Sequence, residues 1–321
     1  MTPPAQLRAL ARTNRNEEKM NRTYAKPFLK WAGGKTGLLP ELRKYYPARL
    51  GLEGGPDTYV EPFVGAGAVL FDLLGEGRVT KAVICDINRE LMTSYRVVRD
   101  RCRELTGLLA RYEADYNSAG DERKKELYLE MRREFNLMRS FSNLGGEMDV
   151  SLTAHLLFLN KTCFNGLYRV NRRGEFNVPF NRAAKIHFDT ENLMLAGQAL
   201  ADTEILDGDY RQLTERIDGR CFIYVDPPYR PLTKTASFTD YDRLPFGDDA
   251  QRQLAAWARE QKDKGAFVML SNSDPHNADP EDDFFDELYA DFEIHRVSAV
   301  RNINSDKSGR GHVSELLITG Y

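Results

Sequence analysis

The chain has 321 residues, of which 41% are hydrophobic and 29% charged, and this composition is typical of a globular protein that buries a full core. No apolar run approaches the roughly 20 residues that span a bilayer, and the N-terminus lacks the apolar stretch of a signal peptide. Four dispersed cysteines and five scattered histidines argue against a zinc site or a disulfide framework. We therefore expect a cytoplasmic protein with reduced thiols and no metal.

The net charge of −3 conceals two basic segments. Residues 8–49 contain 11 Lys/Arg and 3 Asp/Glu, a balance of +8, and residues 161–185 contain 6 basic residues and one acid, a balance of +5. Charge runs are usually plain solvated surface, but two such segments brought to one face would bind a polyanion.

Strands and helices are predicted to alternate along much of the chain. Short apolar runs followed by Gly, Asp or Pro predict buried strands at 58–60, 82–85, 221–225 and 266–270. Helical patterns lie at 68–74, 90–109 and 248–262, and this alternation is typical of a doubly wound α/β core.

One stretch, from about residue 99 to 200, interrupts the alternation. It has no convincing buried strand and instead contains a charged amphipathic helix at Asp121–Arg139. We predict a discontinuous core at 24–98 and 200–321, a mainly helical insertion at 99–199, and a basic, flexible arm at 1–23.

Two acidic or glycine-containing turns favour a nucleoside ligand. Glu61-Pro-Phe-Val-Gly65-Ala-Gly67 predicts a strand, a tight turn and a helix start, but Leu70 stands where a dinucleotide site needs a third glycine. Asp86 ends the next apolar run, where a carboxylate can accept hydrogen bonds from ribose hydroxyls. Either feature alone could be a structural turn or a helix cap, whereas the pair favours an adenosine-containing ligand without a pyrophosphate.

Trp31-Ala-Gly-Gly-Lys35-Thr resembles a phosphate-binding loop only superficially. Leu29 occupies the position of the required first glycine, and no suitable strand precedes it. The indole could stack on an adenine and Lys35 could reach a carboxylate, although a buried Trp and a solvated Lys would explain this segment alone.

Asp226-Pro-Pro-Tyr229 follows the apolar run 221–225 and therefore lies at the carboxyl end of a predicted strand, where α/β sheets place their active sites. The N6 lone pair of adenine is delocalised into the ring. A carboxylate and a backbone carbonyl that accept its two N–H groups would make this nitrogen nucleophilic. The prolines stiffen the loop, and the tyrosine can stack on a base swung out of a duplex.

Taken together, the motifs of this chain resemble those of a known family, the DNA adenine methylases (N6-adenine-specific, GATC-type, D12 class, α-group). The matching motifs, in the family's order, are Phe28-Leu-Lys-Trp-Ala-Gly-Gly-Lys35, Glu61-Pro-Phe-Val-Gly-Ala-Gly67, Asp86-Ile-Asn88, Asn165-Gly-Leu-Tyr-Arg169-Val-Asn, Arg173-Gly-Glu-Phe-Asn-Val-Pro-Phe180, Asp226-Pro-Pro-Tyr229 and Ser271-Asn-Ser-Asp274. They span most of residues 24–321.

The resemblance implies an α/β fold, a seven-stranded Rossmann-like methyltransferase sheet with an inserted helical target-recognition subdomain and hairpin. It implies that S-adenosyl-L-methionine is the methyl donor and double-stranded DNA the substrate. The target adenine would be flipped out of the duplex and methylated directly at N6, and the expected target sequence is GATC. A monomer suffices for this reaction. The implied cofactor residues are Trp31, Lys35, Phe63, Gly65, Gly67, Asp86 and Asp226, and the implied catalytic residues are Asp226, Pro227 and Tyr229.

The resemblance also implies a set of DNA-binding residues. Lys30, Asn165, Leu167 and Arg169 match positions that read bases, and Arg and Asn are the favoured partners of guanine and adenine. Arg172, Arg173 and Arg182 are expected to hold phosphates. Tyr168 and Ala183 depart from the pattern of some relatives, which puts the flanking-base preference in question.

Several alternatives remain or are excluded on chemistry. N4-cytosine methyltransferases usually have Ser in place of Asp226, and RNA or protein-glutamine methyltransferases usually have Asn there. C5-cytosine methylation needs a Pro-Cys nucleophile, and none of the four cysteines follows a proline. An amine methyltransferase with another target sequence and an inactive DNA-binding specificity module remain open.

Overall fold

A computed structural model describes residues 24–141, 146–230, 246–300 and 312–321. Their framework is a seven-stranded sheet in the order β3-β2-β1-β4-β5-β7-β6. Strands β1 to β5 are parallel, and β7 is antiparallel to both of its neighbours. The strands are β1 (Thr58–Glu61), β2 (Lys81–Asp86), β3 (Thr203–Asp207), β4 (Cys221–Val225), β5 (Phe267–Ser273), β6 (Glu293–Val300) and β7 (His312–Thr319).

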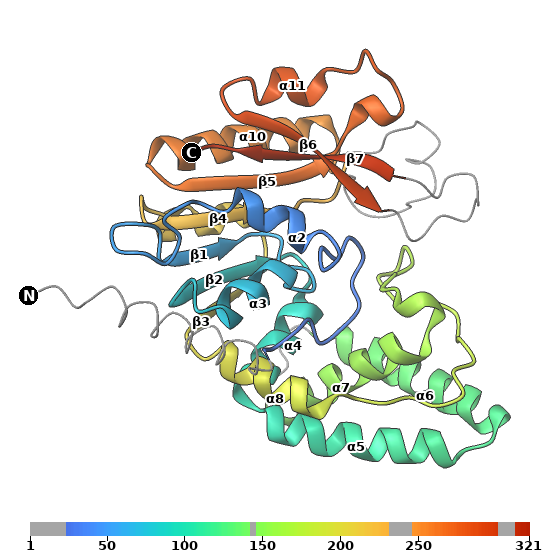
Figure 1. The fold of residues 1–321 in the computed structure, drawn as a ribbon. Coiled ribbons are helices and arrows are strands. Elements are labelled where there is room, and N and C mark those ends of the chain that lie inside the picture. Colours follow the sequence, from blue (N-terminus) through green and yellow to red (C-terminus); the bar gives the residue numbers. More distant parts are fainter. Residues whose placement is uncertain (1–23, 142–145, 231–245, 301–311) are drawn as a thin grey trace, which may run out of the picture.

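Helices cover both faces of this sheet (Figure 1). One face packs against α3 (Ala68–Gly75), α4 (Arg89–Asp100) and α8 (Thr190–Ala199), and the other against η3 (Tyr210–Arg216), α10 (Asp248–Asp263) and α11 (Phe284–Leu288). All five residues of β4 are buried, as expected for a parallel strand covered on both sides. Alternate residues therefore enter different cores, Phe222 and Tyr224 on the first face and Ile223 and Val225 on the second.

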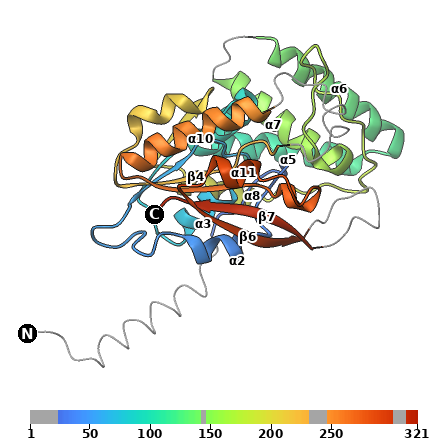
Figure 2. The same cartoon turned by 90° about the horizontal axis from the view of Figure 1, so that it is seen from above.

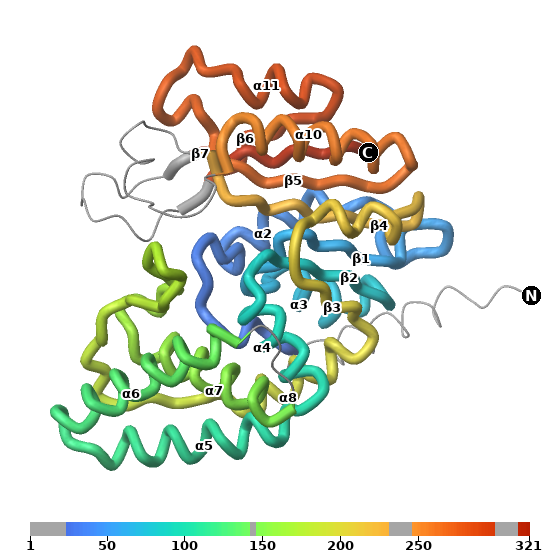
Figure 3. Tube along the Cα trace, turned by 180° about the vertical axis from the view of Figure 1, so that it is seen from behind, coloured from blue at the N-terminus to red at the C-terminus, as the bar shows by residue number. Residues whose placement is uncertain are grey.

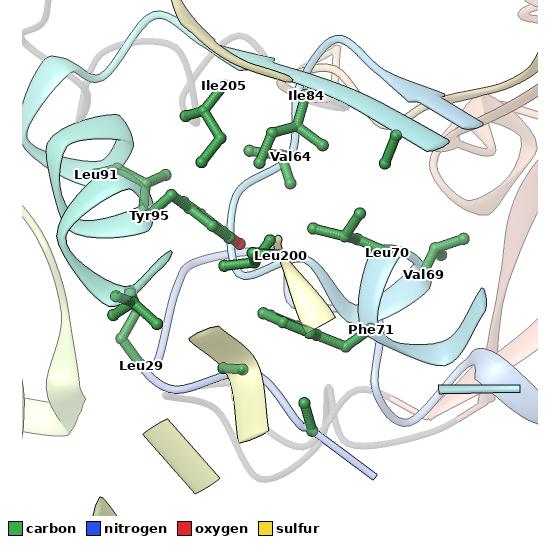
Figure 4. Close-up of a cluster of buried hydrophobic side chains, with 14 of the residues drawn as sticks. Leu29, Val64, Val69, Leu70, Phe71, Ile84, Leu91, Tyr95, Leu200 and Ile205 are labelled. Carbon is green, nitrogen blue, oxygen red and sulfur yellow. The ribbon is translucent and has the colours of Figure 1, made fainter. Parts of the chain in front are cut away.

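The core on the α3 face fixes the helices beside the first two strands. Figure 4 shows Tyr95 of α4 pointing toward Leu70 and Phe71 of α3, with Ile84 of β2 above them. Tyr95 and Phe71 stack at 6.4 Å between ring centroids. Asn88 caps the N-terminus of α4, because its side chain accepts a hydrogen bond from the Leu91 amide. The start of the helix is thereby fixed directly after β2.

A second group of helices, α5 (Cys102–Ser118), α6 (Asp121–Arg139) and α7 (Glu147–Thr162), gathers beside α4 and α8 (Figures 2 and 3). Helix α7 is buried nearly all round because it serves two cores. Its Ala154 and Phe158 join the main core, and its Leu152 and Leu156 join a smaller cluster with α6. That smaller cluster also buries Phe176 and Val178 of the segment that follows α7, after the short η2 turn (Phe164–Gly166).

Most sequence predictions of local structure are confirmed, with two corrections. The four predicted strands match β1, β2, β4 and β5, and the helices at 68–74, Asp121–Arg139 and 248–262 match α3, α6 and α10. The single helix predicted at 90–109 is wrong, because Arg101 leaves the helical conformation (φ −134°, ψ 30°) and the chain restarts as α5. Strands β3, β6 and β7 were not predicted.

Three short elements complete the described chain: α2 (Leu39–Leu42), η1 (Arg43–Tyr45) and η4 (Pro275–Asn277). None of the described helices has both the length and the apolar character needed to cross a lipid bilayer. The predicted N-terminal arm, 1–23, lies outside the described residues.

Candidate active site

The strand order reverses between β1 and β4, where the connections leave in opposite directions. In open α/β sheets a crevice forms at the carboxyl ends of such neighbouring strands. Here those ends carry Glu61 and the Gly65 turn after β1, and Asp226 directly after β4. Asp86 ends the adjacent β2, so three motifs from separate segments of the sequence converge on one edge of the sheet.

The turn after β1 needs both of its glycines. Gly65 and Gly67 have positive φ values of 48° and 72°, a region that strains other residues. A Cβ on Gly67 would lie 2.6 Å from the Tyr95 hydroxyl, and one on Gly65 would lie 3.1 Å from the Trp31 ring. The turn therefore brings backbone without side chains next to an indole at this edge of the sheet.

Asp86 is tied to this turn by hydrogen bonds. The Gly65 amide donates to Asp86 Oδ2 at 3.1 Å and the Asn88 amide donates to Oδ1 at 2.9 Å. Burial raises the pKa of Asp86 above its ordinary value, and these amides oppose that rise. Each oxygen retains a lone pair, so the carboxylate can still accept hydrogen bonds from a ligand.

Lys35 and Asp226 form an ion pair in the crevice, 2.9 Å between Nζ and Oδ2. Their side chains are only 9% and 16% exposed, and the Gly33 carbonyl also accepts from Lys35 at 2.9 Å. The other Asp226 oxygen, Oδ1, is buried and has no hydrogen-bond partner among the described residues. Burial raises the pKa of Asp226, whereas Lys35 lowers it. This buried carboxylate therefore keeps one acceptor atom that no described residue uses.

Tyr229 is anchored at both its ring and its hydroxyl. Lys35 Nζ lies 4.7 Å from the ring centroid, and the hydroxyl donates to Glu315 Oε2 of β7 at 2.9 Å. Burial raises the pKa of Tyr229 well above its ordinary value, so this group stays a neutral phenol. The ring is thereby held as a flat apolar surface near Asp226.

The loop that carries these residues is fixed from below by buried amides. Gln251 of α10 donates to the Pro228 carbonyl at 3.2 Å and accepts from Asn272 of β5 at 3.1 Å. Ser273 donates to the Arg230 carbonyl at 3.0 Å. The Ser271-Asn-Ser-Asp274 motif thus supports the loop that carries Asp226-Pro-Pro-Tyr229.

Trp31 lies between the glycine turn and the segment after α7. The centroid of its ring is 5.0 Å from that of Tyr168, and the two rings are tilted by 30°. Tyr168 is itself held near the Arg139–Glu90 ion pair, with Arg139 5.8 Å above its ring. Phe63, by contrast, packs against Tyr210 and Phe246 on the α10 face of the sheet.

A second constellation surrounds the turn after α7. The Asn160 side chain accepts from the Lys30 amide at 2.9 Å and donates to the carbonyls of Lys30 and Gly166. Asn165 has a left-handed φ of 56°, and a Cβ on Gly166 would lie 2.7 Å from Lys30 Cδ. Two predicted DNA-reading residues, Lys30 and Asn165, are thereby brought together with their side chains exposed.

The remaining predicted DNA-binding residues lie along the segment that follows. Leu167 and Arg169 are exposed. An antiparallel β-bridge between Val170 and Phe176 folds the segment back on itself, and Asn177 accepts a hydrogen bond from Arg169 Nε at 2.8 Å across it. Arg172 and Arg173 are exposed near its tip. Arg182 is also exposed but is paired with Asp121 at the start of α6, farther along the same segment.

Four residues of these sites were not singled out by the sequence. Glu315 lies on a strand that was not predicted, and Gln251 lies in an amphipathic helix that reads as ordinary. Ile87 is 82% exposed directly after Asp86, and Phe164 is 52% exposed directly before Asn165. Exposed apolar side chains next to motif residues are the signal that could have indicated Ile87 and Phe164.

Comparison with known proteins decides the family. The family model described as D12 class N6 adenine-specific DNA methyltransferase matches residues 31–303. The chain belongs to this family. The predicted resemblance is confirmed, and so are the seven-stranded methyltransferase sheet and the prediction of an adenine-specific DNA methyltransferase.

Curated relatives of this D12 methyltransferase are similar to it in sequence over nearly their whole length. The chain is 44% identical over 300 residues to the Type II methyltransferase M.MjaIII of Methanocaldococcus jannaschii, covering 92% of this chain and 99% of that protein. It is 34% identical to the Type II methyltransferase M1.LlaDCHI of Lactococcus lactis subsp. cremoris, covering 94% and 97%. It is 32% identical to the DNA adenine methylase of Escherichia coli (strain K12), covering 90% and 93%.

Proposed function

We propose that this methyltransferase transfers the methyl group of S-adenosylmethionine to N6 of an adenine that is flipped out of double-stranded DNA, within GATC. The observation that carries the proposal is the buried, unpartnered Oδ1 of Asp226 beside the Lys35 ammonium. A charged acceptor without a partner is costly in the free protein, so a ligand N–H group is the natural partner for it.

The crevice suits an adenosine-containing cofactor. Asp86 would accept from the ribose hydroxyls, the bare turn at Gly65 and Gly67 permits close approach, and Trp31 and the exposed Ile87 offer apolar surface for the adenine ring. Lys35 would lie near the cofactor's carboxylate while it pairs with Asp226. Phe63 would contribute less directly, through the floor below the turn.

When bound, S-adenosylmethionine supplies a sulfonium-activated methyl group. Asp226 Oδ1 and the Pro227 carbonyl would accept the two N–H groups of adenine, which shifts N6 toward a tetrahedral geometry with an available lone pair. The N6 lone pair would attack the methyl carbon while the electrons of the methyl–sulfur bond stay on sulfur, and Asp226 would accept the surplus N6 proton through its hydrogen bond. Tyr229 would hold the base by stacking.

The insertion at 99–199 would recognise the target sequence. The exposed side chains around the turn after α7 are those of Lys30, Asn165, Leu167 and Arg169. Arg and Asn side chains suit the guanine and adenine edges in the major groove. Phe164 adds an exposed aromatic surface beside Asn165 that could enter a disturbed base stack. Arg172, Arg173 and Arg182 would bind phosphates, with Arg182 exchanging its Asp121 partner for DNA.

The test is expression in a host that lacks DNA methylation, followed by sequencing that reports N6-methyladenine. Methylation confined to GATC is the expected result. Methylation of adenine in another sequence would retain the chemistry and replace the GATC assignment. An absence of methyladenine, with folded protein in the cells, would contradict the proposed reaction.

A further inference from the structure

Two carboxylates, Asp226 and Glu315, and one cation, Lys35, are linked through Tyr229. Lys35 pairs with Asp226 at 2.9 Å and lies 4.7 Å from the ring centroid of Tyr229, whose hydroxyl donates to Glu315 at 2.9 Å. Glu315 belongs to β7, the antiparallel strand next to β5, opposite Ser273. The chain therefore brings a second acid to the site from a distant part of the sequence, and the reaction as derived above gives it no role.

We propose that Glu315 is a positioning residue for methyl transfer, which clamps Tyr229 by accepting a hydrogen bond from its hydroxyl and whose negative charge opposes, at Asp226, the positive charge of Lys35. The proposal rests on the proposed function, because it assumes that Asp226 accepts the adenine N–H and that Tyr229 stacks on the base.

The clamp follows from the geometry of the tyrosine. A phenol ring rotates about two side-chain bonds, and a stacking surface must hold one orientation when the base arrives. One hydrogen bond to a charged acceptor, of the stronger class, holds the far end of the ring, and Lys35 faces the ring from the Asp226 side. Glu315 is only partly exposed and sits on a strand bonded on both sides, so the anchor is rigid.

The electrostatic role follows from the charges around Asp226. Lys35 stabilises the carboxylate and weakens it as an acceptor, while Glu315 has the opposite influence and raises the pKa of Asp226. The other titratable groups that interact with Asp226 lie on its own loop, on β4 and at the end of β1. They are Tyr229, Tyr224 and Glu61.

Three substitutions separate the two roles. Glu315→Gln removes the charge and retains an oxygen that accepts from Tyr229, so we expect the acid limb of the kcat/KM profile to move down by roughly half a pH unit or more, with little change in plateau kcat. Tyr229→Phe removes the hydrogen bond and retains the charge, so kcat falls roughly tenfold and the limb does not move to lower pH. Glu315→Ala combines both effects.

The substrate is unmethylated DNA from a methylation-deficient host with tritiated S-adenosylmethionine, and thermal melting verifies the fold of each variant. Glu293→Gln, a carboxylate of β6 beyond the site, is the matched control and should reproduce the wild-type profile. If Glu315→Gln has the wild-type acid limb, or Glu315→Ala has the wild-type kcat, the role of Glu315 is refuted while the proposed function stands. If the wild-type protein methylates nothing, both fall.

Discussion

At the scale of single residues, the reactive character of the site depends on how solvent is excluded around Asp226. Its Oδ2 is paired with Lys35 and its Oδ1 is buried without a partner among the described residues. Burial of a carboxylate is costly, and the lysine offsets only part of that cost. The arrangement leaves an acceptor that gains more from binding a ligand N–H group than a solvated carboxylate would.

Asp226→Asn tests this residue with almost no change in volume. Loss of the negative charge should lower kcat at least about a hundredfold, because the amide is a weaker acceptor and takes no proton from N6. Methyl transfer to unmethylated DNA measures kcat. Asp248→Asn, which alters a carboxylate paired with Arg230 outside the crevice, is the control and should retain near wild-type turnover. Undiminished turnover by Asp226→Asn would refute the acceptor role.

Glu61 makes a second residue-level prediction, about stability. Burial raises the pKa of Glu61 well above its ordinary value, and the Asp226 and Asp86 carboxylates add to the rise. An acid with a raised folded-state pKa contributes stability that is complete below its unfolded pKa and is lost as the pH rises through the folded pKa. Between these limits each pH unit costs about 1.4 kcal/mol.

Glu61→Gln keeps the neutral shape and removes this titration. We therefore expect the melting temperature of the variant to exceed that of the wild type by a margin that grows as the pH rises above the ordinary pKa of a glutamate. Denaturation monitored by circular dichroism measures the difference at each pH. A margin that is constant or shrinks with pH would show that Glu61 ionises in the folded protein as freely as in the unfolded chain.

At the scale of elements, α7 joins the two parts of the molecule. One set of its side chains packs into the main core and another into the cluster with α6. Near its end Asn160 binds the backbone of both Lys30 and Gly166, and these hydrogen bonds tie the N-terminal motif to the turn that carries Asn165. In the sequence, Lys30 and Asn160 are 130 positions apart.

Arg169 tests whether this element reads bases. Its guanidinium donates to Asn177 Oδ1 at 2.8 Å, and in the proposed function this exposed side chain makes a bidentate contact with a base. Arg169→Ala should relax discrimination between the target and a one-base mismatch by about 1–3 kcal/mol, measured as binding to paired duplexes. Arg173→Ala, at the hairpin tip, should weaken binding to both duplexes equally. An equal loss in Arg169→Ala would make it a phosphate contact as well.

At the scale of the whole molecule, a protein with a net charge of −3 must bind a polyanion through local charge. The segment 161–185, with a balance of +5, follows α7 and carries the exposed arginines near the predicted base readers. We expect log K for duplex binding to fall linearly with log salt, with a slope of about −0.9 for each neutralised phosphate. Fluorescence anisotropy at several salt concentrations measures it, and a flat response would contradict DNA binding by this face.

Local sequence predicted the parts of the fold that local physics controls. Fully buried runs such as Cys221–Val225 predicted central strands, because parallel strands are apolar on both faces. Strands β6 and β7 mix polar and apolar residues, and the edge strand β3 is exposed in part, so their patterns were too weak. The break at Arg101 also escaped prediction, since a charged residue gives no stop signal within a helical pattern.

The sequence by itself determined the family, the motifs and the residue types, because glycine turns, a stiff Asp-Pro-Pro-Tyr loop and a strand-end acid each carry a chemical requirement within a few residues. Only the tertiary structure decided which of them meet. The Lys35–Asp226 pair, the Tyr229–Glu315 clamp and the Lys30–Asn160–Gly166 linkage join residues from distant segments. Such contacts depend on strand order and helix packing, which no local pattern encodes.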